Sequence, residues 1–439
     1  MQRLFNTEGP IVIDDHYHID PLHRLDWEEV QFLIGAKKYF VLHAPRQTGK
    51  TSTLFSMMHE LNQSGQYVAV YANIEGAQAA RNNVDMGITA VCEAIADQAA
   101  AWNVTESLQT ILSETKRNRS PSSALTDLLS KWAKVSDKPC VLFLDEVDAL
   151  VGDTLISLLR QIRAGFGQRP GAFPHSIILC GVRDVQDYRT HIGGDVITGG
   201  SAFNIKAKSL RMGNFSQQEI QNLYLQHTKE TGQTFAPQLF DLLWLDTQGQ
   251  PWLVNALAYQ MTWEDRANRD RNKTITLADY LAAREFLIQS RTTHLHQLST
   301  KLKEPRVRSV IGPMLAGGVL PDILPEDIDY VVDLGLVNRA SNGALAIANR
   351  IYQEVIPRDL SWSIQSAIEQ QQSWYVKEDN QLDMAKLLAA FVQYFRENSE
   401  AWVERFDYKE VAPQLLLQAF LQRVVNGGGR INREYALGT

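Results

Sequence analysis

Hydrophobic and polar positions follow two alternating periods along the first half of the chain. Apolar runs at 40–42, 67–73, 140–144 and 176–181 predict short strands, and longer stretches with helical spacing separate them. Runs this apolar are typical of strands that are buried on both faces. We place a last strand near 203–207. The alternation predicts the α/β class, with a parallel sheet and helices on both of its faces.

The helical regions differ in their breaks and caps. Residues 80–135 are mostly helical, and the polar run TKRNRSPSS at 115–123 predicts an exposed loop within them. The sequence pattern changes at residue 214, and Ser216 and Glu219 then form the pattern of a capping box at a helix start. Helical spacing then continues to about residue 290.

Two shorter regions follow. Residues 296–357 carry two helix-forming stretches and then two short apolar runs, an order that suggests a winged helix-turn-helix. Its charges nearly balance, so phosphate contacts could add little affinity for DNA, and a protein-facing role is favoured. Residues 358–439 hold a strongly apolar helix at 411–425 and a strand-like stretch at 430–435.

The clearest chemical motif is FVLHAPRQTGKTST at residues 40–53. A buried strand, a loop and a helix that opens with Gly49-Lys50-Thr51 form the layout of a phosphate-binding loop. Backbone N–H groups of such a loop cradle phosphate oxygens, and the helix N-terminus adds its positive end. Lys50 would reach the β- and γ-phosphates, and Thr51 would place its hydroxyl on Mg²⁺. The predicted nucleotide-binding residues here are Ala44, Pro45, Arg46, Gln47, Thr48, Gly49, Lys50, Thr51 and Ser52.

One position of this loop departs from the usual pattern. G-x-x-x-x-G-K-[ST] has glycine where this chain has Ala44. Alanine is small but resists positive φ, so the geometry of the loop is the point to check. Without further support, the segment could also be an ordinary Gly-Lys turn before a helix.

The acidic strand CVLFLDE at residues 140–146 supplies that support. Asp145 and Glu146 stand at the carboxyl end of the strand, where ligands bind in open α/β sheets. Asp145 is the candidate for holding Mg²⁺, and Glu146 for orienting or deprotonating the attacking water. A strand that ends in a solvated acidic turn is the plain alternative. The pairing with Gly49-Lys50-Thr51 favours a site for nucleoside triphosphate hydrolysis.

Arginines supply further candidates. Arg183 follows the strand at 176–181 and is the first candidate for a sensor of the γ-phosphate, with Asp184 as the second. The two residues could instead form an ordinary surface pair at the strand end. Arg160 and Arg163 could act as arginine fingers in a neighbouring subunit, but a solvated helix face is the favoured explanation.

A second nucleotide element is predicted in TQGQPWL at residues 247–253. Gly249 and Pro251 at a helix start could bring the backbone against the base or ribose. Proline at the first helical position is also an ordinary structural cap.

Composition sets limits on these functions. The chain has 439 residues and a net charge of −7, so it is not a basic nucleic-acid binder as a whole. Its three cysteines are widely spaced and are interpreted as reduced, structural thiols. It has no signal-peptide pattern and no apolar run of about 18 residues, so we expect a cytoplasmic protein without membrane contact.

Taken in order, APRQTGKT, CVLFLDE, SIILCGVRD and TQGQPWLVNALA resemble the bacterial and archaeal AAA-type ATPases related to the STAND class. The resemblance implies a P-loop ATPase core at 1–213, a helical lid with a G-x-P element at 214–295 and a winged helix at 296–357. It also implies that Gly249 and Pro251 sense the nucleotide.

The tail has a resemblance of its own. Residues 408–439 look like the start of a PD-(D/E)XK nuclease-like domain, with Glu410 as the helix glutamate. The aspartate and the E-x-K element of that domain have no counterpart before the chain ends. We therefore expect 358–439 to be a truncated nuclease-like domain without nuclease activity.

The leading hypothesis is a Mg²⁺-dependent ATPase, with hydrolysis coupled to movement of the lid and winged helix. The rivals are a signalling switch with slow turnover and nucleotide-dependent assembly, and a DNA-directed effector in defence or mobile elements. ATP is preferred over GTP because no N-K-x-D motif follows the acidic strand. An unknown protein partner is expected, and nucleic acid has weaker support.

Overall fold

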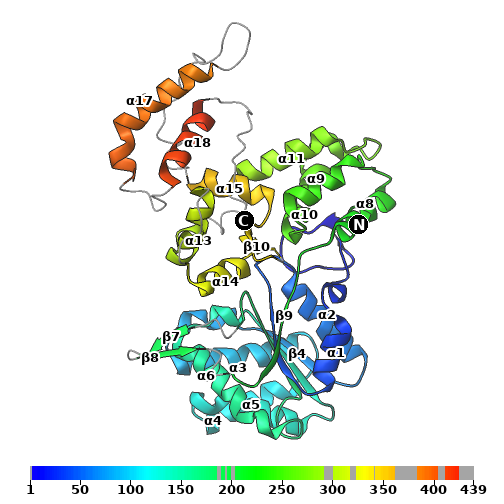
Figure 1. Cartoon of the computed structure of the whole chain (residues 1–439). Coiled ribbons are helices and arrows are strands. Elements are labelled where there is room, and N and C mark those ends of the chain that lie inside the picture. Colours follow the sequence, from blue (N-terminus) through cyan, green and yellow to red (C-terminus); the bar gives the residue numbers. More distant parts are fainter. Residues whose placement is uncertain are drawn as a thin grey trace. The chain divides into compact units, whose positions relative to one another are not determined.

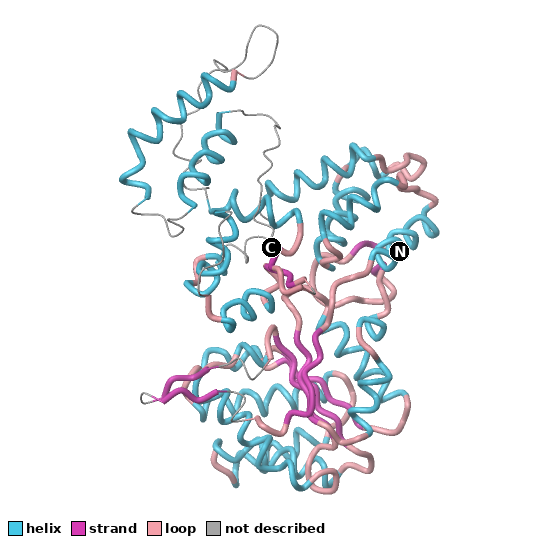
Figure 2. The backbone as a smooth tube through the Cα atoms, viewed as in Figure 1, coloured by secondary structure: helices cyan, strands magenta, loops and turns pink. Residues whose placement is uncertain are grey.

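The computed structural model describes residues 2–184, 189–192, 195–198, 203–290, 300–316, 323–340, 342–360, 383–403 and 411–424. Contacts divide the chain into two compact units. The first comprises 1–233 and 249–259, and the second comprises 234–248 and 260–439. Figure 1 labels the elements, and Figure 2 shows the strands in magenta and the helices in cyan.

A five-stranded parallel sheet forms the centre of the first unit, in the order β4-β5-β6-β3-β9. The strands are β3 (Tyr39–His43), β4 (Val68–Asn73), β5 (Cys140–Asp145), β6 (Ser176–Gly181) and β9 (Lys206–Arg211). The predicted α/β class and its first four strands are confirmed. The last strand was misplaced, because it begins at Lys206 rather than at Phe203. Phe203 is apolar because it is buried in the core beside the sheet, not because it belongs to a strand.

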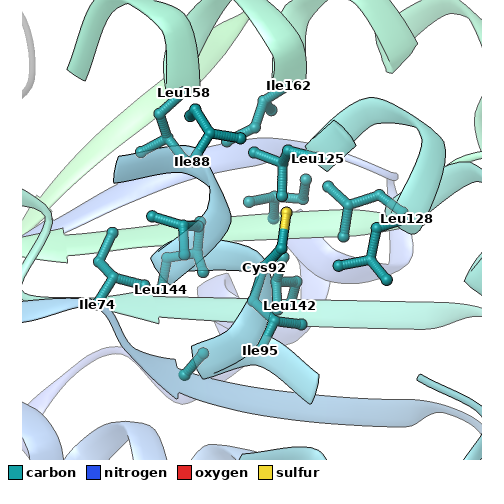
Figure 3. Packing of buried hydrophobic residues seen from close by; sticks show 14 of the residues in the cluster. Ile74, Ile88, Cys92, Ile95, Leu125, Leu128, Leu142, Leu144, Leu158 and Ile162 are labelled. Carbon is teal, nitrogen blue, oxygen red and sulfur yellow. The ribbon is translucent and has the colours of Figure 1, made fainter. Parts of the chain in front are cut away.

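Helices cover both faces of this sheet (Figure 1). One face carries α1 (Trp27–Gly35) and α2 (Lys50–Gln63); the other carries α3 (Val84–Ala101), α4 (Ser107–Asn118), α5 (Pro121–Val135) and α6 (Gly152–Gly165). Successive strand residues point to opposite faces. Leu142 and Leu144 therefore pack under α3, α5 and α6, as Figure 3 shows, whereas Val141 and Phe143 belong to the core below α1 and α2. This double burial explains the uninterrupted apolar runs.

The predicted loop at 115–123 is wrong, because helices occupy most of that stretch. Only Arg119 and Ser120 separate α4 from α5, and Pro121 is at the first position of α5, where its missing N–H costs nothing. Thr115 is completely buried, and its hydroxyl donates a hydrogen bond to Asp127 at 2.9 Å. The polar residues lie on the outer faces of two helices.

Smaller elements complete the first unit. β1 (Leu4–Phe5) pairs in parallel with β2 (His16–Tyr17), and β7 (Arg189–Ile192) pairs antiparallel with β8 (Asp195–Thr198). α8 (Gln217–Thr231) begins with the predicted capping box, and α10 (Pro251–Tyr259) begins at the predicted proline. Short 3-10 helices lie at η1 (Pro21–Arg24), η2 (Glu75–Ala80), η3 (Val147–Ala149) and η4 (Phe166–Gln168).

The second unit is mainly helical. Its helices are α9 (Gln238–Thr247), η6 (Gln260–Glu264), η7 (Arg266–Arg269), α11 (Leu277–Ser290), α13 (Pro305–Ala316), α14 (Pro325–Asp333), α15 (Arg350–Leu360), α17 (Met384–Val403) and α18 (Ala412–Val424). β10 (Val337–Arg339) and β11 (Leu345–Ile347) form an antiparallel pair after α13 and α14.

These elements match the expected order of helices and strands within 296–357. Their identity as a winged helix, the four domain limits and the nuclease-like tail stay predictions. Glu410 and the strand expected at 430–435 lie outside the described residues.

A buried ion cluster joins three helices of the second unit. Arg284 of α11 is 5% exposed and lies 2.9 Å from Asp246 of α9 and 2.5 Å from Glu354 of α15. The hydroxyl of Tyr280 donates to the same Asp246 at 2.8 Å. Charges this deeply buried must be paired, so the cluster fixes how these helices pack.

Two expectations from composition can also be compared with the structure. Cys92, Cys140 and Cys180 are free and buried, and the last two lie within strands of the sheet. Within the described residues, no helix has the length and apolarity needed to span a membrane.

Candidate nucleotide-binding site

The predicted phosphate-binding loop connects β3 to α2. Its Ala44 is completely buried, has a negative φ and donates its N–H to the carbonyl oxygen of Gly181 at 3.2 Å. Left-handed backbone occurs instead at Gln47 (φ 56°) and at Gly49 (φ 92°), which is the N-cap of α2. Alanine at position 44 therefore meets no conformational penalty, and the departure from the usual pattern leaves the loop intact.

Lys50 folds over this loop from the first turn of α2. Its ammonium donates to the carbonyl oxygens of Ala44 and Pro45, each at 3.0 Å. The hydroxyl of Thr48 also donates to the carbonyl of Pro45, at 2.7 Å. The side chain of Lys50 is thus buried and hydrogen-bonded to neutral carbonyls, an arrangement from which it can turn to a phosphate oxygen.

Thr51 of α2 and Asp145 at the end of β5 meet directly, although β6 lies between β5 and β3, the strand that leads into α2. The Thr51 hydroxyl donates to Asp145 Oδ2 at 2.7 Å, and the Tyr71 hydroxyl donates to the same oxygen at 3.0 Å. The backbone N–H of Glu146 donates to Oδ1 at 2.9 Å. Asp145 is completely buried, and burial beside its charge raises the pKa of Tyr71. These hydrogen bonds fix the orientation of the Asp145 carboxylate.

The Thr51 hydroxyl and the Asp145 carboxylate are suitable ligands for Mg²⁺. One hydroxyl and one carboxylate side by side are the hard oxygen ligands that this ion takes from proteins, with water and substrate phosphates completing its shell. Tyr71 is a residue of the site that sequence reasoning missed. The sequence predicted the strand that contains Tyr71, but only the structure shows that this strand pairs with the acidic strand.

Glu146 leaves the sheet in a left-handed backbone conformation, with φ 58°. Its side chain is partly buried, and burial raises its pKa above the usual range, with a further rise from the neighbouring Asp148. Asp148 itself accepts a hydrogen bond from the N–H of Val182 at 3.1 Å, which ties the end of β6 to the acidic turn. Glu146 is therefore a carboxylate with increased basicity at the carboxyl edge of the sheet.

Arg183 follows β6, which lies between the phosphate-binding strand β3 and the acidic strand β5. This order places Arg183 at the sheet edge between the two motifs, and its role as a sensor stays a prediction. Asp184 forms an ion pair with Lys206. Arg160 and Arg163 are both exposed on α6.

A cavity opens beside the phosphate-binding loop within the first unit. Its walls come from the N-terminal segment, the loop, α8 and α10; they include Asn6, Thr7, Glu8, Gly9, Ile11, Tyr17, His18, Ile19, Pro21, Arg24, Gln47, Thr48, Gly49, Ser52, Thr53, Phe215, Leu223, Pro251, Trp252 and Asn255. Two hydrogen bonds hold the N-terminal wall in place. The N–H of Ile11 donates to the Ser52 hydroxyl at 3.0 Å, and Trp252 Nε1 donates to the carbonyl of Thr7 at 3.0 Å.

The two residues predicted from TQGQPWL have different places. Pro251 lines the cavity, whereas Gly249 packs against the backbone of Phe215. The N–H of Phe215 donates to the carbonyl of Gly249 at 2.8 Å, and a Cβ on Gly249 would lie 1.9 Å from the Phe215 carbonyl oxygen. Gly249 therefore lets two chain segments touch, and Phe215, which this contact positions, lines the cavity.

Arg24 is a second site residue that the sequence did not reveal. Its guanidinium donates to the carbonyl of Thr48 at 3.1 Å and to the carbonyl of Gly213, and it stacks 4.5 Å from the ring centre of Phe215. Burial lowers the pKa of Arg24 to about 10, so the guanidinium stays charged at neutral pH. It adds a buried positive charge next to the phosphate-binding loop.

The family of the chain follows from a comparison with models of known families. Residues 34–306, which include the phosphate-binding loop, the acidic strand and α10, match the model described as an AAA-like domain. The chain belongs to this AAA-like family. None of the curated proteins compared with it matches.

Solved structures support the same fold. A Walker-type ATPase of Pyrococcus abyssi has a TM-score of 0.50 and 13% identity, and the match covers 80% of this chain and 99% of that one. The Aeropyrum pernix ORC2 protein in its ADPNP and ADP complexes has a TM-score of 0.45 and 12% identity, over 77% and 94% of the two chains. Cdc6p from Pyrobaculum aerophilum has a TM-score of 0.43 and 17% identity, over 82% and 98%. At 13% identity, the match to the Walker-type ATPase shows a shared fold alone.

Proposed function

We propose that this AAA-like protein binds Mg-ATP at the β3–α2 loop and hydrolyses it to ADP and phosphate. The observation that carries the proposal is the hydrogen bond of 2.7 Å between Thr51 and Asp145. It joins the phosphate-binding loop to the acidic strand, 94 positions away in the sequence. Phosphoryl transfer needs little else from a protein than positioning and neutralisation of charge, which this pairing supplies.

Each residue then has a role that follows from its place. The loop N–H groups at the N-terminus of α2 bind phosphate oxygens, and Lys50 neutralises the β- and γ-phosphates. Glu146 accepts a proton from water as the water oxygen attacks the γ-phosphorus. The bond from that phosphorus to the β–γ bridging oxygen breaks, and its electron pair stays on ADP. The proton on Glu146 later passes to solvent or phosphate.

Thr51 and Asp145 would hold Mg²⁺, which would neutralise charge on the phosphate oxygens when bound. Arg183 is proposed to sense the γ-phosphate from the end of β6, and Pro251 to contact the base or ribose in the cavity. In line with the STAND resemblance, hydrolysis is coupled to movement of the helical lid at 214–295 and the winged helix at 296–357.

Release of phosphate tests the reaction. The wild type should release phosphate from Mg-ATP, and Glu146→Gln should reduce the rate by about 100-fold or more while it retains binding, because general bases contribute about that much. Glu60→Gln, the same change at an exposed position of α2, is the matched control and should leave the rate unchanged. Phosphate release by Glu146→Gln at the wild-type rate would refute the assigned role.

A slow-turnover switch, in which nucleotide controls assembly, is the second candidate. In a switch, Glu146→Gln should trap ATP and an assembled state. Light scattering after gel filtration would then show a higher mass with Mg-ATP than without it. A mass that does not change with nucleotide would argue against the switch.

A further inference from the structure

Asn255 contributes an unmatched hydrogen-bond acceptor to the wall of the cavity. It lies on α10, one turn after Pro251, and its Nδ2 donates to the carbonyl oxygen of Pro251 at 2.8 Å. Its Oδ1 is buried and has no hydrogen-bond partner among the described residues. Buried side-chain oxygens are normally paired, so this one calls for a donor that the protein does not supply.

The orientation of the Asn255 amide follows from its partner. The oxygen and nitrogen of an amide are distinguished by their hydrogen bonds, and the carbonyl of Pro251 can only accept. The nitrogen must therefore face Pro251, which leaves the oxygen as the unmatched group. The missing partner is a donor, and a molecule in the cavity can provide it.

The other walls indicate which part of a nucleotide would lie near α10. Gln47, Thr48 and Gly49 contribute the phosphate-binding end of the cavity, together with the start of α2. Trp252 adds aromatic surface elsewhere in the wall, and planar bases stack on such surface. Of the purine substituents, an exocyclic amino group donates hydrogen bonds and an exocyclic oxygen only accepts them.

We propose that Asn255 Oδ1 accepts a hydrogen bond from the 6-amino group of adenine and makes the site selective for 6-aminopurine over 6-oxopurine nucleotides. This inference rests on the proposed nucleotide site. A 6-oxopurine would bring its oxygen against Oδ1 and leave both acceptors unmatched. Sites that are built around one hydrogen bond discriminate strongly against ligands that cannot make it.

Inosine triphosphate is the sharpest probe, because it differs from ATP in having an oxygen in place of the 6-amino group. Calorimetric titrations of Mg-ATP and Mg-ITP give a ratio of dissociation constants within one protein, so a general loss of affinity cancels. The wild type should bind ITP at least about 10-fold more weakly than ATP. Asn255→Leu removes the acceptor and should bring the ratio close to 1.

Two further variants control this test. Asn222→Leu makes the same change at an exposed position of α8 and should keep the wild-type ratio. Asn255→Ala removes the same acceptor with a smaller side chain and should also bring the ratio close to 1, so the inference stays testable if the leucine variant does not fold.

The outcomes separate this inference from the proposed function. Equal binding of ATP and ITP by the wild type would overturn the inference and leave the nucleotide site standing. Binding of neither nucleotide would overturn both. Equal ATP and ITP binding, with 2′- or 3′-deoxy-ATP weaker in the wild type but not in Asn255→Leu, would show that the amide reads the ribose and would also overturn the inference.

Discussion

Replacement of Gly249 by alanine tests the close contact between the backbones of Gly249 and Phe215, just before α10. The added Cβ would lie 1.9 Å from the Phe215 carbonyl oxygen, far inside the 3.0 Å that real Cβ contacts respect. Gly249 also has φ 70°, where a non-glycine residue costs about 1–2 kcal/mol. Neither backbone can give way easily, since a hydrogen bond of 2.8 Å joins the two residues.

The size of the effect follows from these terms. Overpacking costs about 1–3 kcal/mol, and loss of the hydrogen bond adds about 1 kcal/mol. With the backbone term, we expect destabilisation by roughly 3–6 kcal/mol. Mg-ATP should also bind more weakly, because Phe215 lines the cavity and stacks against Arg24.

Gly232→Ala is the matched control for this change. Gly232 also has positive φ, 79°, at the end of α8, but a Cβ added there would have no atom within 4 Å. The free energy of unfolding of this variant should fall by about 1–2 kcal/mol, the cost of the strained backbone, and its affinity for Mg-ATP should stay unchanged. Denaturant unfolding and calorimetry would compare both variants with the wild type. Equal effects of the two substitutions on stability and on binding would refute the reasoning.

Three other predictions follow from the same contacts. Trp252→Phe removes the hydrogen bond to the Thr7 carbonyl, so the free energy of unfolding should fall by about 1 kcal/mol and ATP should bind more weakly. Unchanged ATP binding would show that this hydrogen bond does not hold the cavity wall. Arg284→Leu leaves the buried Asp246 without its cation and should destabilise the second unit by about 3–5 kcal/mol, although Glu354 keeps Arg358 at 3.7 Å. Arg339→Leu, in an exposed pair, should cost at most about 1 kcal/mol, and similar losses of stability in the two variants would contradict the importance given to burial. Glu146 must be ionised to accept a proton, and burial raises its pKa. The hydrolysis rate should therefore fall on acidification at a higher pH than expected for an ordinary carboxylate with a pKa of about 4.3. A rate that falls only near pH 4.3 would contradict this role.

The sequence predicted the sheet and the two motifs because their signals are local. A strand buried on both faces must be an apolar run, and Gly49-Lys50-Thr51 between a strand and a helix is typical of a phosphate-binding loop when an acidic strand follows. Most of the rest depends on tertiary contacts. Thr115 belongs to the polar run that predicted a loop. It can be buried in a helix because its hydroxyl donates a hydrogen bond to Asp127, 12 positions away.

The site illustrates the same limit. Arg24 is one arginine among many in the sequence, and only folding brings it to the carbonyls of Thr48 and Gly213. Asn255 gives no signal in the sequence, because what matters is the oxygen that its neighbours leave unmatched. Ala44 shows the converse. The sequence pattern raised a concern about loop geometry, and the negative φ at this position removes it.

Calorimetric titration of Mg-ATP into the wild type and Lys50→Ala tests the central claim most directly, with Lys134→Ala, an exposed lysine on α5, as the control. We predict saturable binding by the wild type and the control, and loss of binding by Lys50→Ala. Full binding by Lys50→Ala, or none by the wild type, would contradict the assignment of the nucleotide site.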